Sequence, residues 1–158
     1  MTLRQPSLTA QQGVALIEVM IAFLVLSIAL IGYSALQVRA VKATQSSMQR
    51  TDASILAANI VESLRANKSA AVDPSHPYAL ATRTCTPPPT DGSLVQNDVN
   101  AWFLSLQAAL GSASTCADIT CSDSASAAPG ICTVNIYWDD SRALGGLSNQ
   151  SIQLVGRL

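Results

Sequence analysis

Residues 13–36 read GVALIEVMIAFLVLSIALIGYSAL, a long apolar run that predicts a helix at the start of the chain. The run from Val14 to Leu36 is long enough to cross a bilayer as a helix, which needs about 20 residues. Its one charged residue is Glu18, five positions after Gly13. A charge inside a membrane span costs free energy, so Glu18 is a functional candidate by default. The alternative interpretation is that Glu18 lies near the start of the span and reaches the membrane interface.

A secretory signal peptide is the alternative to a retained membrane anchor. The apolar core of a signal peptide spans about 7–15 residues and is followed by a small-residue cleavage site. This run is longer, and the small residues beyond it lie in sequence that continues with helical character. We therefore expect a retained anchor over residues 14–36.

The composition restricts the class of protein. The chain has 158 residues, which fits one domain of ordinary size. Charged residues make up 12% and the net charge is −1, so nothing indicates a nucleic-acid surface. The basic residues that flank the run are balanced and do not set its orientation. Four cysteines follow residue 84 without metal-type spacing, which favours an oxidising compartment and places the C-terminal part outside the cytoplasm.

The helical sequence continues past the anchor. Residues 37–67 contain no proline and no glycine. Apolar residues recur there at intervals of seven and of four, which predicts an amphipathic face: Val41, Met48 and Ile55, then Leu56, Ile60 and Leu64. One helix from Val14 to Asn67 would be roughly 80 Å long. We expect its first part to be embedded and residues 37–67 to dock on a globular head formed by residues 68–158.

The head is predicted to combine one helix with a small antiparallel sheet. Prolines between Asn67 and Gly92 argue against a regular helix or a central strand there. A helix capped by Asn97 or Asp98 should bury one face and end at Gly111; that face consists of Val99, Trp102, Phe103, Leu106 and Leu110. Trp102 is interpreted as a core anchor. Strands are predicted at Cys116–Cys121, Ile131–Trp138 and Ser151–Leu158, in a sheet of three or four strands.

The cysteines allow three disulfide pairings. Cys121 and Cys132 flank ten residues between two predicted strands, which favours a cross-strand bridge and leaves Cys85 to pair with Cys116. The spacing alone leaves the connectivity open.

Motifs for catalysis or metal binding are weak. The chain has no CxxC, and His76 is its single histidine, so a zinc site is not expected. Asp139 and Asp140 follow a predicted strand without further acidic residues at calcium-loop spacing, so we interpret them as a solvated turn. No clustered carboxylates and no nucleophile motif are present, and we expect neither an enzyme nor a cofactor.

The segment Gly13–Met20 resembles the class III signal of type IV prepilins and pseudopilins. The resemblance implies that residues 1–13 are a leader, that a membrane prepilin peptidase cuts between Gly13 and Val14, and that Val14 is then N-methylated. The usual first residue in that family is Phe, and here it is Val14. Three further stretches are similar to minor pilins of the PilV type: Ser63–Asn67, Asp98–Leu110 with Trp102, and Val134–Asp140.

This resemblance implies an α+β, type IV pilin-like fold and a role in pilus assembly. A minor pilin of this kind sits in the lipid of the inner membrane with its head in the periplasm and enters the pilus with other minor pilins and the major pilin. It helps to form a tip complex, which can include a PilY-type adhesin, and so supports adhesion and twitching motility. Glu18 would pair with the new Val14 amine of a neighbouring subunit.

Two alternatives remain at this level. One is a minor pseudopilin of a type II secretion system, which shares the N-terminal signal. The other is a single-pass membrane protein with a periplasmic binding or enzymatic domain, which would need no prepilin peptidase.

Overall fold

The computed structural model describes residues 12–111, 115–143 and 145–158, with side chains for all of these except residues 12–15, 81 and 82. The chain divides into two compact units, Met1–Val41 and Lys42–Leu158. We call the second unit the head unit. The long helix α1, Gln12–Ala66, contributes to both. Its bounds lie within two residues of the predicted helix.

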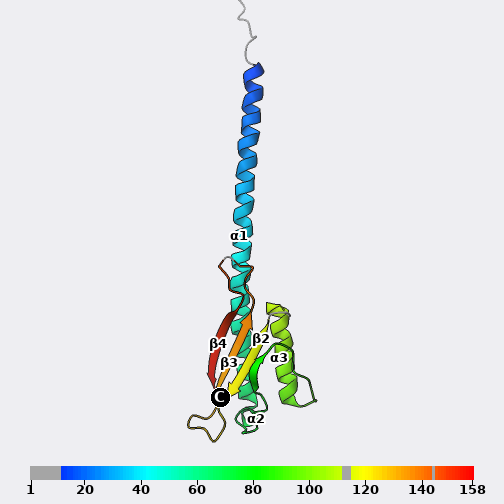
Figure 1. Cartoon of the computed structure of the whole chain (residues 1–158), viewed down its shortest axis with the longest axis vertical. Coiled ribbons are helices and arrows are strands. Elements are labelled where there is room, and N and C mark those ends of the chain that lie inside the picture. Colours follow the sequence, from blue (N-terminus) through cyan, green and yellow to red (C-terminus); the bar gives the residue numbers. More distant parts are fainter. Residues whose placement is uncertain (1–11, 112–114, 144) are drawn as a thin grey trace, which may run out of the picture. The chain divides into compact units, whose positions relative to one another are not determined.

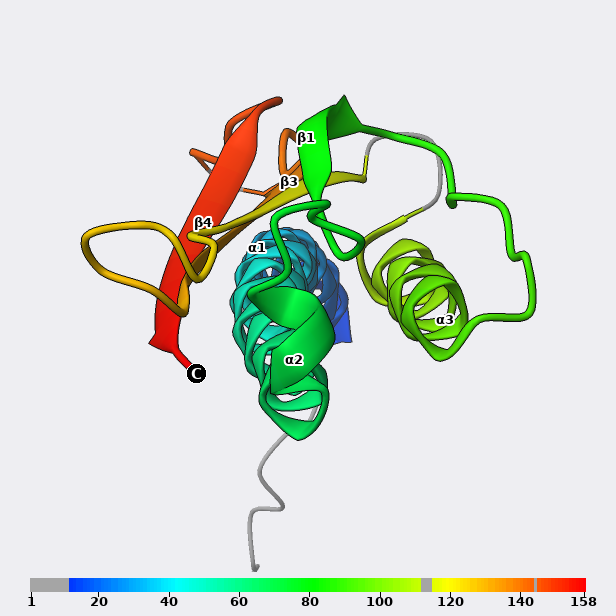
Figure 2. The same ribbon diagram turned by 90° about the horizontal axis from the view of Figure 1, so that it is seen from below.

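The head unit places a four-stranded sheet over the second part of α1. After α1 come α2 (Lys68–Ala71), β1 (Leu80–Thr84), α3 (Leu94–Leu110), β2 (Cys116–Cys121), β3 (Ile131–Trp138) and β4 (Gln150–Arg157). The strands follow the order β1-β2-β3-β4, and each pairs antiparallel with the next (Figure 1). Within the head unit, α1 and α3 lie side by side beneath the sheet (Figure 2). The predicted α+β fold, a long helix packed on a small antiparallel sheet with one extra helix, is confirmed.

The core forms between the two helices and one face of the sheet. All five residues predicted on the buried face of α3 are buried. On β3, Val134, Ile136 and Trp138 are buried and alternate with half-buried residues, as the period of two predicts. These elements bury the faces that their sequence periodicity indicates.

The prediction for the buried face of α1 is wrong in the first half of residues 37–67. Val41, Met48 and Ile55 expose 66%, 60% and 53% of their area. The buried face instead consists of residues spaced three or four apart: Ala53, Ala57, Ile60, Val61 and Leu64. Two of these are alanines, whose small side chains allow the other layers of the head unit to pack closely against α1.

Two local predictions for the head also need correction. The helix α3 begins at Leu94 rather than beside Asn97 or Asp98, because Ser93 Oγ accepts a hydrogen bond from Gln96 N at 3.2 Å and caps the helix. The proline-containing loop also holds a short helix, α2, and an edge strand, β1. The prolines lie outside β1, so none removes a hydrogen bond from it.

Candidate functional site

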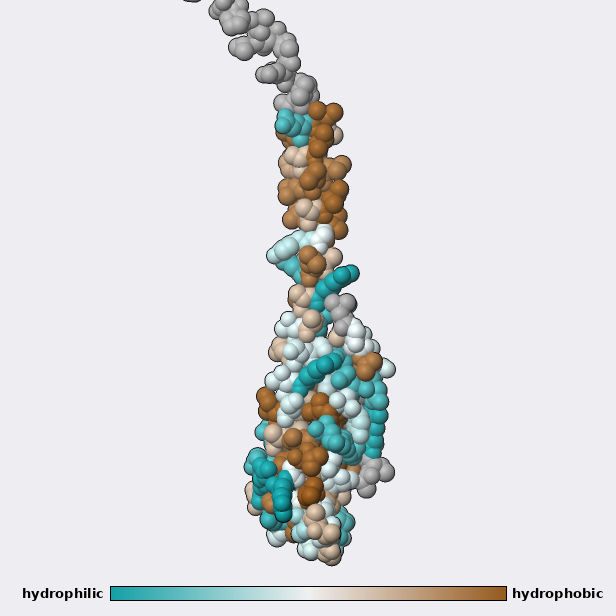
Figure 3. Space-filling model, turned by 90° about the vertical axis from the view of Figure 1, so that its left-hand side faces the viewer, coloured by the Kyte–Doolittle hydropathy of each residue, from teal (hydrophilic) through white to brown (hydrophobic). Residues whose placement is uncertain are grey.

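The first unit presents an apolar helix surface. Its large apolar side chains from Leu16 to Val41 are at least half exposed. Figure 3 shows the brown surface that these residues give to this stretch. Among the described residues, α1 is the one helix long and apolar enough to cross a membrane. A helix with its apolar side chains exposed all round fits a lipid or a filament core.

The two serine hydroxyls within this stretch bond to the helix itself. Ser27 Oγ donates to the Phe23 carbonyl at 2.7 Å, and Ser34 Oγ donates to the Leu30 carbonyl at 2.8 Å. Polar groups in a membrane must find partners within the protein. Both serines are therefore compatible with apolar surroundings.

Glu18 is the one charged residue between Val14 and Leu36. Its side chain is exposed, and in the described part of the chain it takes part in no hydrogen bond or ion pair. Gly13 and Val14 lie in the first turn of α1, where no side chain is described before Leu16, and residues 1–11 of the expected leader lie outside the described residues. Val14 and Glu18 are four residues apart, so they share one face of the helix.

Within the head unit, β4 approaches α1 closely. A Cβ atom built on Gly156 would lie 2.6 Å from Val61 Cγ1 of α1. Real Cβ atoms do not approach other atoms so closely, so glycine is required for this contact. On the other side of α1, Trp102 Nε1 of α3 donates to the Leu56 carbonyl at 2.8 Å. Trp102 is 6% exposed, which confirms it as a core anchor.

The turn after β3 forms a second attachment to α1. Asp140 is 3% exposed and its Oδ2 accepts a hydrogen bond from Ser46 Oγ at 2.6 Å. Arg50 Nη2 lies 3.6 Å from the same oxygen. Gly146 packs directly against the Asp140 carbonyl, at a distance that leaves no room for a Cβ atom. The predicted solvated turn is thus wrong for Asp140, because contacts with α1 bury it.

The neighbouring Asp139 does behave as a solvated turn residue. It is exposed, and its Oδ1 accepts the backbone N–H of Ser141 at 2.8 Å. Hydrogen bonds from the side chain and backbone of Ser141 hold the pKa of Asp139 below its ordinary value. The two adjacent carboxylates therefore differ because only one of them faces α1.

A hollow of about 420 Å³ lies between α1, the end of α3 and the turn after β3. Two basic residues, Lys42 and Arg142, line it together with Asp139 and Asp140. This lining has no excess of either charge, so it does not select an anion or a cation.

Both disulfides lie in the head unit. Cys85 pairs with Cys116, which ties the segment after β1 to the start of β2. Cys121 pairs with Cys132, the residue directly opposite it on β3. These are the pairs that the loop spacing favours.

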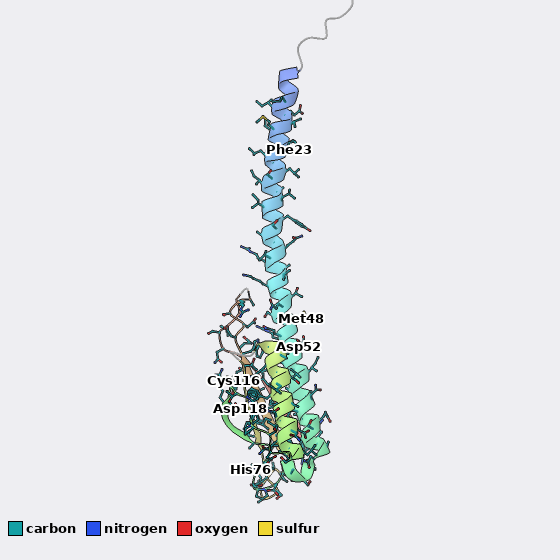
Figure 4. The ribbon with its side chains drawn as sticks, turned by 90° about the vertical axis from the view of Figure 1, so that its right-hand side faces the viewer. Phe23, Met48, Asp52, His76, Cys116 and Asp118 are labelled. Atoms are coloured by element: carbon teal, nitrogen blue, oxygen red, sulfur yellow. A yellow bond between two sulfur atoms is a disulfide. The ribbon has the colours of Figure 1, made fainter. Side chains whose placement is uncertain are left out.

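The outer face of the sheet carries a network of polar side chains that no pattern in the sequence predicts. Asp118 accepts hydrogen bonds from Asn135 Nδ2 at 2.6 Å and from Tyr137 OH at 3.0 Å. The Arg83 guanidinium lies 4.2 Å from the centre of the Tyr137 ring. Burial, and then the Asp118 carboxylate, raise the pKa of Tyr137. Figure 4 labels Asp118 on β2, with Cys116 at the start of the same strand.

The described residues contain no group of three or more histidine, cysteine, aspartate or glutamate side chains arranged to hold a metal ion. His76 Nε2 lies 3.9 Å from one oxygen of Asp123, in a loop where His76 has a φ of 50°. This pair lacks the further ligands that a zinc site requires.

Two family models match adjoining parts of the chain. A model described as a prokaryotic N-terminal methylation motif matches residues 8–34, and one described as type IV pilin Tt1218 matches residues 35–93. The first match contains Gly13, Val14 and Glu18, and the second contains β1 and the whole head-unit part of α1. No curated protein and no solved structure gives a match.

Proposed function

We propose that this chain, which its fold and its two family matches support as a type IV pilin, is a minor pilin of the PilV type that primes pilus assembly. One observation carries the proposal: the methylation motif spans the junction where Gly13 precedes an apolar helix with Glu18 as its single charge. Membership among the pilins points to a structural protein. Its function then comes from packing between subunits rather than from catalysis.

The protein is made as a precursor in this proposal. The prepilin peptidase removes residues 1–13 and methylates Val14 at the cytoplasmic face of the inner membrane. Residues 14–36 hold the subunit in the membrane, and the head unit lies in the periplasm. The motif and the exposed apolar helix both fit a subunit that is first anchored in the inner membrane and then taken into a pilus.

Glu18 guides assembly through the new N-terminus. In a bilayer or a filament core, neither the Glu18 carboxylate nor a Val14 amine is well solvated, and opposite charges within about 4–6 Å favour both charged forms. Pairing between neighbouring subunits would set their axial register. Buried ion pairs are better suited to specifying an arrangement than to adding stability.

The partners are other pilus subunits. The apolar helix packs with other minor pilins and the major pilin, and the head contributes to a tip complex that can include a PilY-type adhesin. In this role the protein supports adhesion and twitching motility without touching a nucleic acid or a cofactor.

The test is the N-terminus of the protein in its own cells, measured by mass spectrometry with and without the prepilin peptidase. We expect a methylated Val14 that depends on the peptidase. An intact leader in both strains would contradict the proposal and favour a single-pass anchor with a periplasmic domain.

Deletion of the gene then separates a pilus from a secretion system. We expect pili and twitching to be lost or reduced while type II secretion continues. Loss of secreted enzymes with normal pili would instead identify a minor pseudopilin.

A further inference from the structure

The free edge of β4 carries unpaired backbone groups. Leu158 N donates to the Gly130 carbonyl at 2.8 Å. With the register of β3 and β4, this bond shows that Leu158 and every second residue before it on β4 bond to β3. In an antiparallel pair, every second residue exchanges hydrogen bonds with the neighbouring strand and the residues between turn their N–H and C=O away. Ser151, Gln153 and Val155 therefore direct their backbone groups to the side opposite β3. In Figure 1, β4 forms one border of the sheet.

Only the C-terminal end of this edge is occupied. Arg65 Nε donates to the Arg157 carbonyl at 3.1 Å, and Lys68 Nζ donates to the Leu158 carbonyl at 3.0 Å. Within the described part of the chain, no hydrogen bond reaches the outward backbone groups of Ser151, Gln153 and Val155. An open row of three donors and three acceptors remains.

The opposite edge of the sheet is protected against strand pairing. The edge strand β1 has five residues and an irregular register. Arg83 adds a charge to this strand, with its guanidinium over Tyr137 and bonded to Asn149. Cys85 immediately beyond β1 is held by a disulfide. Short length, irregular pairing and charge are the usual devices that prevent edge strands from binding another chain.

From Gln150 to Gly156, β4 lacks these devices. It pairs with β3 over eight consecutive positions without a shift in register. Residues 150–156 contain no charged residue and no proline. Val155 is 58% exposed, and Ile152 and Leu154 on the inner face are only half-buried.

We propose that the edge of β4, from Ser151 to Val155, binds an extended strand of another subunit in the same assembly. Only a strand presents backbone donors and acceptors at the spacing of this row. Because the row is uncharged, it fits an uncharged segment, whose alternate apolar side chains would cover Ile152 and Leu154. The identity of the partner as a pilus subunit rests on the proposed function.

The test uses photo-crosslinking of the full chain in the bacterium that makes it. A benzophenone amino acid is placed at Ser151, on the proposed edge, and separately at Thr120, which is exposed on the inner strand β2. Crosslinked peptides are identified by mass spectrometry. We expect adducts from position 151 at least tenfold above those from position 120, joined to an uncharged segment of another subunit.

Substitutions on the edge make the test specific. Gln153→Pro removes an outward N–H without removing a bond to β3, so it should reduce the adduct at position 151 at least tenfold. Gln153→Thr changes the same side chain, keeps the N–H and should leave the adduct unchanged. Val155→Lys places a charge on the edge and should also reduce the adduct at position 151. It serves as the second variant if Gln153→Pro does not accumulate.

Three results would overturn the proposal: equal adducts at positions 151 and 120, adducts that persist in both Gln153→Pro and Val155→Lys, or adducts that join two copies of this chain. Methylation of Val14 is measured in the same cells. A methylated N-terminus without an edge adduct would overturn the strand-binding proposal and leave the pilin function in place.

Discussion

At the scale of single residues, two polar side chains lie in apolar surroundings: Glu18 on an exposed helix and Tyr78 in the interior of the head unit. Glu18 lies on an exposed apolar helix and has no partner among the described residues. Tyr78 is 2% exposed, and its hydroxyl donates to Asp98 Oδ2 at 2.9 Å and accepts from Asn67 Nδ2 at 3.2 Å. The first group is available to a neighbouring molecule, whereas the second is satisfied within the head unit.

Glu18→Ala should leave membrane insertion intact and impair assembly. The substitution removes a charge from an apolar span, which lowers the cost of insertion, but it also removes the group proposed to pair with a neighbouring N-terminus. We expect a normal amount in the membrane fraction and at least a tenfold loss from sheared pili, both measured by immunoblotting. Ser27→Ala is the control, since it changes a hydroxyl that bonds only to its own helix. Normal incorporation of Glu18→Ala into pili would count against the assigned role.

Tyr78→Phe should destabilise the head unit and change its response to alkali. Loss of the hydroxyl leaves Asp98 and Asn67 without this partner, at a cost of about 1–2 kcal/mol in the free energy of unfolding. Burial raises the pKa of Tyr78 above its ordinary value of 10.0. Its contribution is therefore complete below pH 10 and is lost as the pH rises through the folded-state pKa.

Denaturant unfolding of the full chain in detergent, followed by circular dichroism at several pH values, checks both effects. The drop in stability above pH 10 should be smaller in Tyr78→Phe, and the part that remains is expected from Tyr137, whose pKa is also raised. An identical alkaline drop in both proteins would show that Tyr78 does not control it.

At the scale of elements, the contact between α1 and β4 depends on the absence of a side chain. Gly156 allows β4 to approach Val61 more closely than any other residue would. On the same strand, the outward edge remains open, as the crosslinking experiment tests. β4 thus packs against the core through Ile152, Leu154 and Gly156, while its outward edge is the surface that the proposal assigns to another chain.

Gly156→Ala should lower the free energy of unfolding by about 1–3 kcal/mol, because overpacking forces the strand or the helix to shift. The double variant Val61→Ala, Gly156→Ala removes the opposing methyl groups and should recover part of the loss. Gly32→Ala is the matched control, since a Cβ there meets nothing within 4 Å. Denaturant unfolding of the three full-length variants measures the effect. Equal stability of Gly156→Ala and the natural chain would contradict the close packing.

At the scale of the whole molecule, the two disulfides close the head unit around its sheet. Cys85–Cys116 encloses a sequence separation of 31 and Cys121–Cys132 one of 11. Both lie in the unit that the proposal places in the periplasm, where disulfides persist. The two bridges together hold β1, β2 and β3 in place.

Replacing Cys85 and Cys116 by alanine should destabilise the head unit by about 3–4 kcal/mol, because the unfolded chain regains the entropy of a long loop. Replacing Cys121 and Cys132 should lower the stability slightly less, since this disulfide closes a shorter loop. Thermal unfolding of both full-length double variants tests the order. The ranking would be contradicted if the pair with the shorter loop lowered Tm more.

Much of this protein follows from local sequence patterns. The length of the run from Val14 to Leu36 sets the apolar helix, the spacing from Val99 to Leu110 sets the buried face of α3, and alternation along Ile131–Trp138 sets β3. These patterns are readable because helices and strands repeat over neighbouring residues. The junction at Gly13 is equally local, and one of the family matches covers it.

Only the tertiary structure decides which parts of the chain meet. Ser46 and Asp140 are 94 positions apart, and their contact buries a carboxylate that the sequence places in a solvated turn. The sequence pattern likewise mispredicts the first half of the buried side of α1, because Ala53 and Ala57 face the core while the larger Met48 and Ile55 remain exposed. Ile60 and Leu64 are buried as predicted. The open edge of β4 depends on strand order and ladder phase. The sequence by itself determines the elements because their periodicity is local, whereas burial and pairing depend on long-range packing that no short pattern encodes.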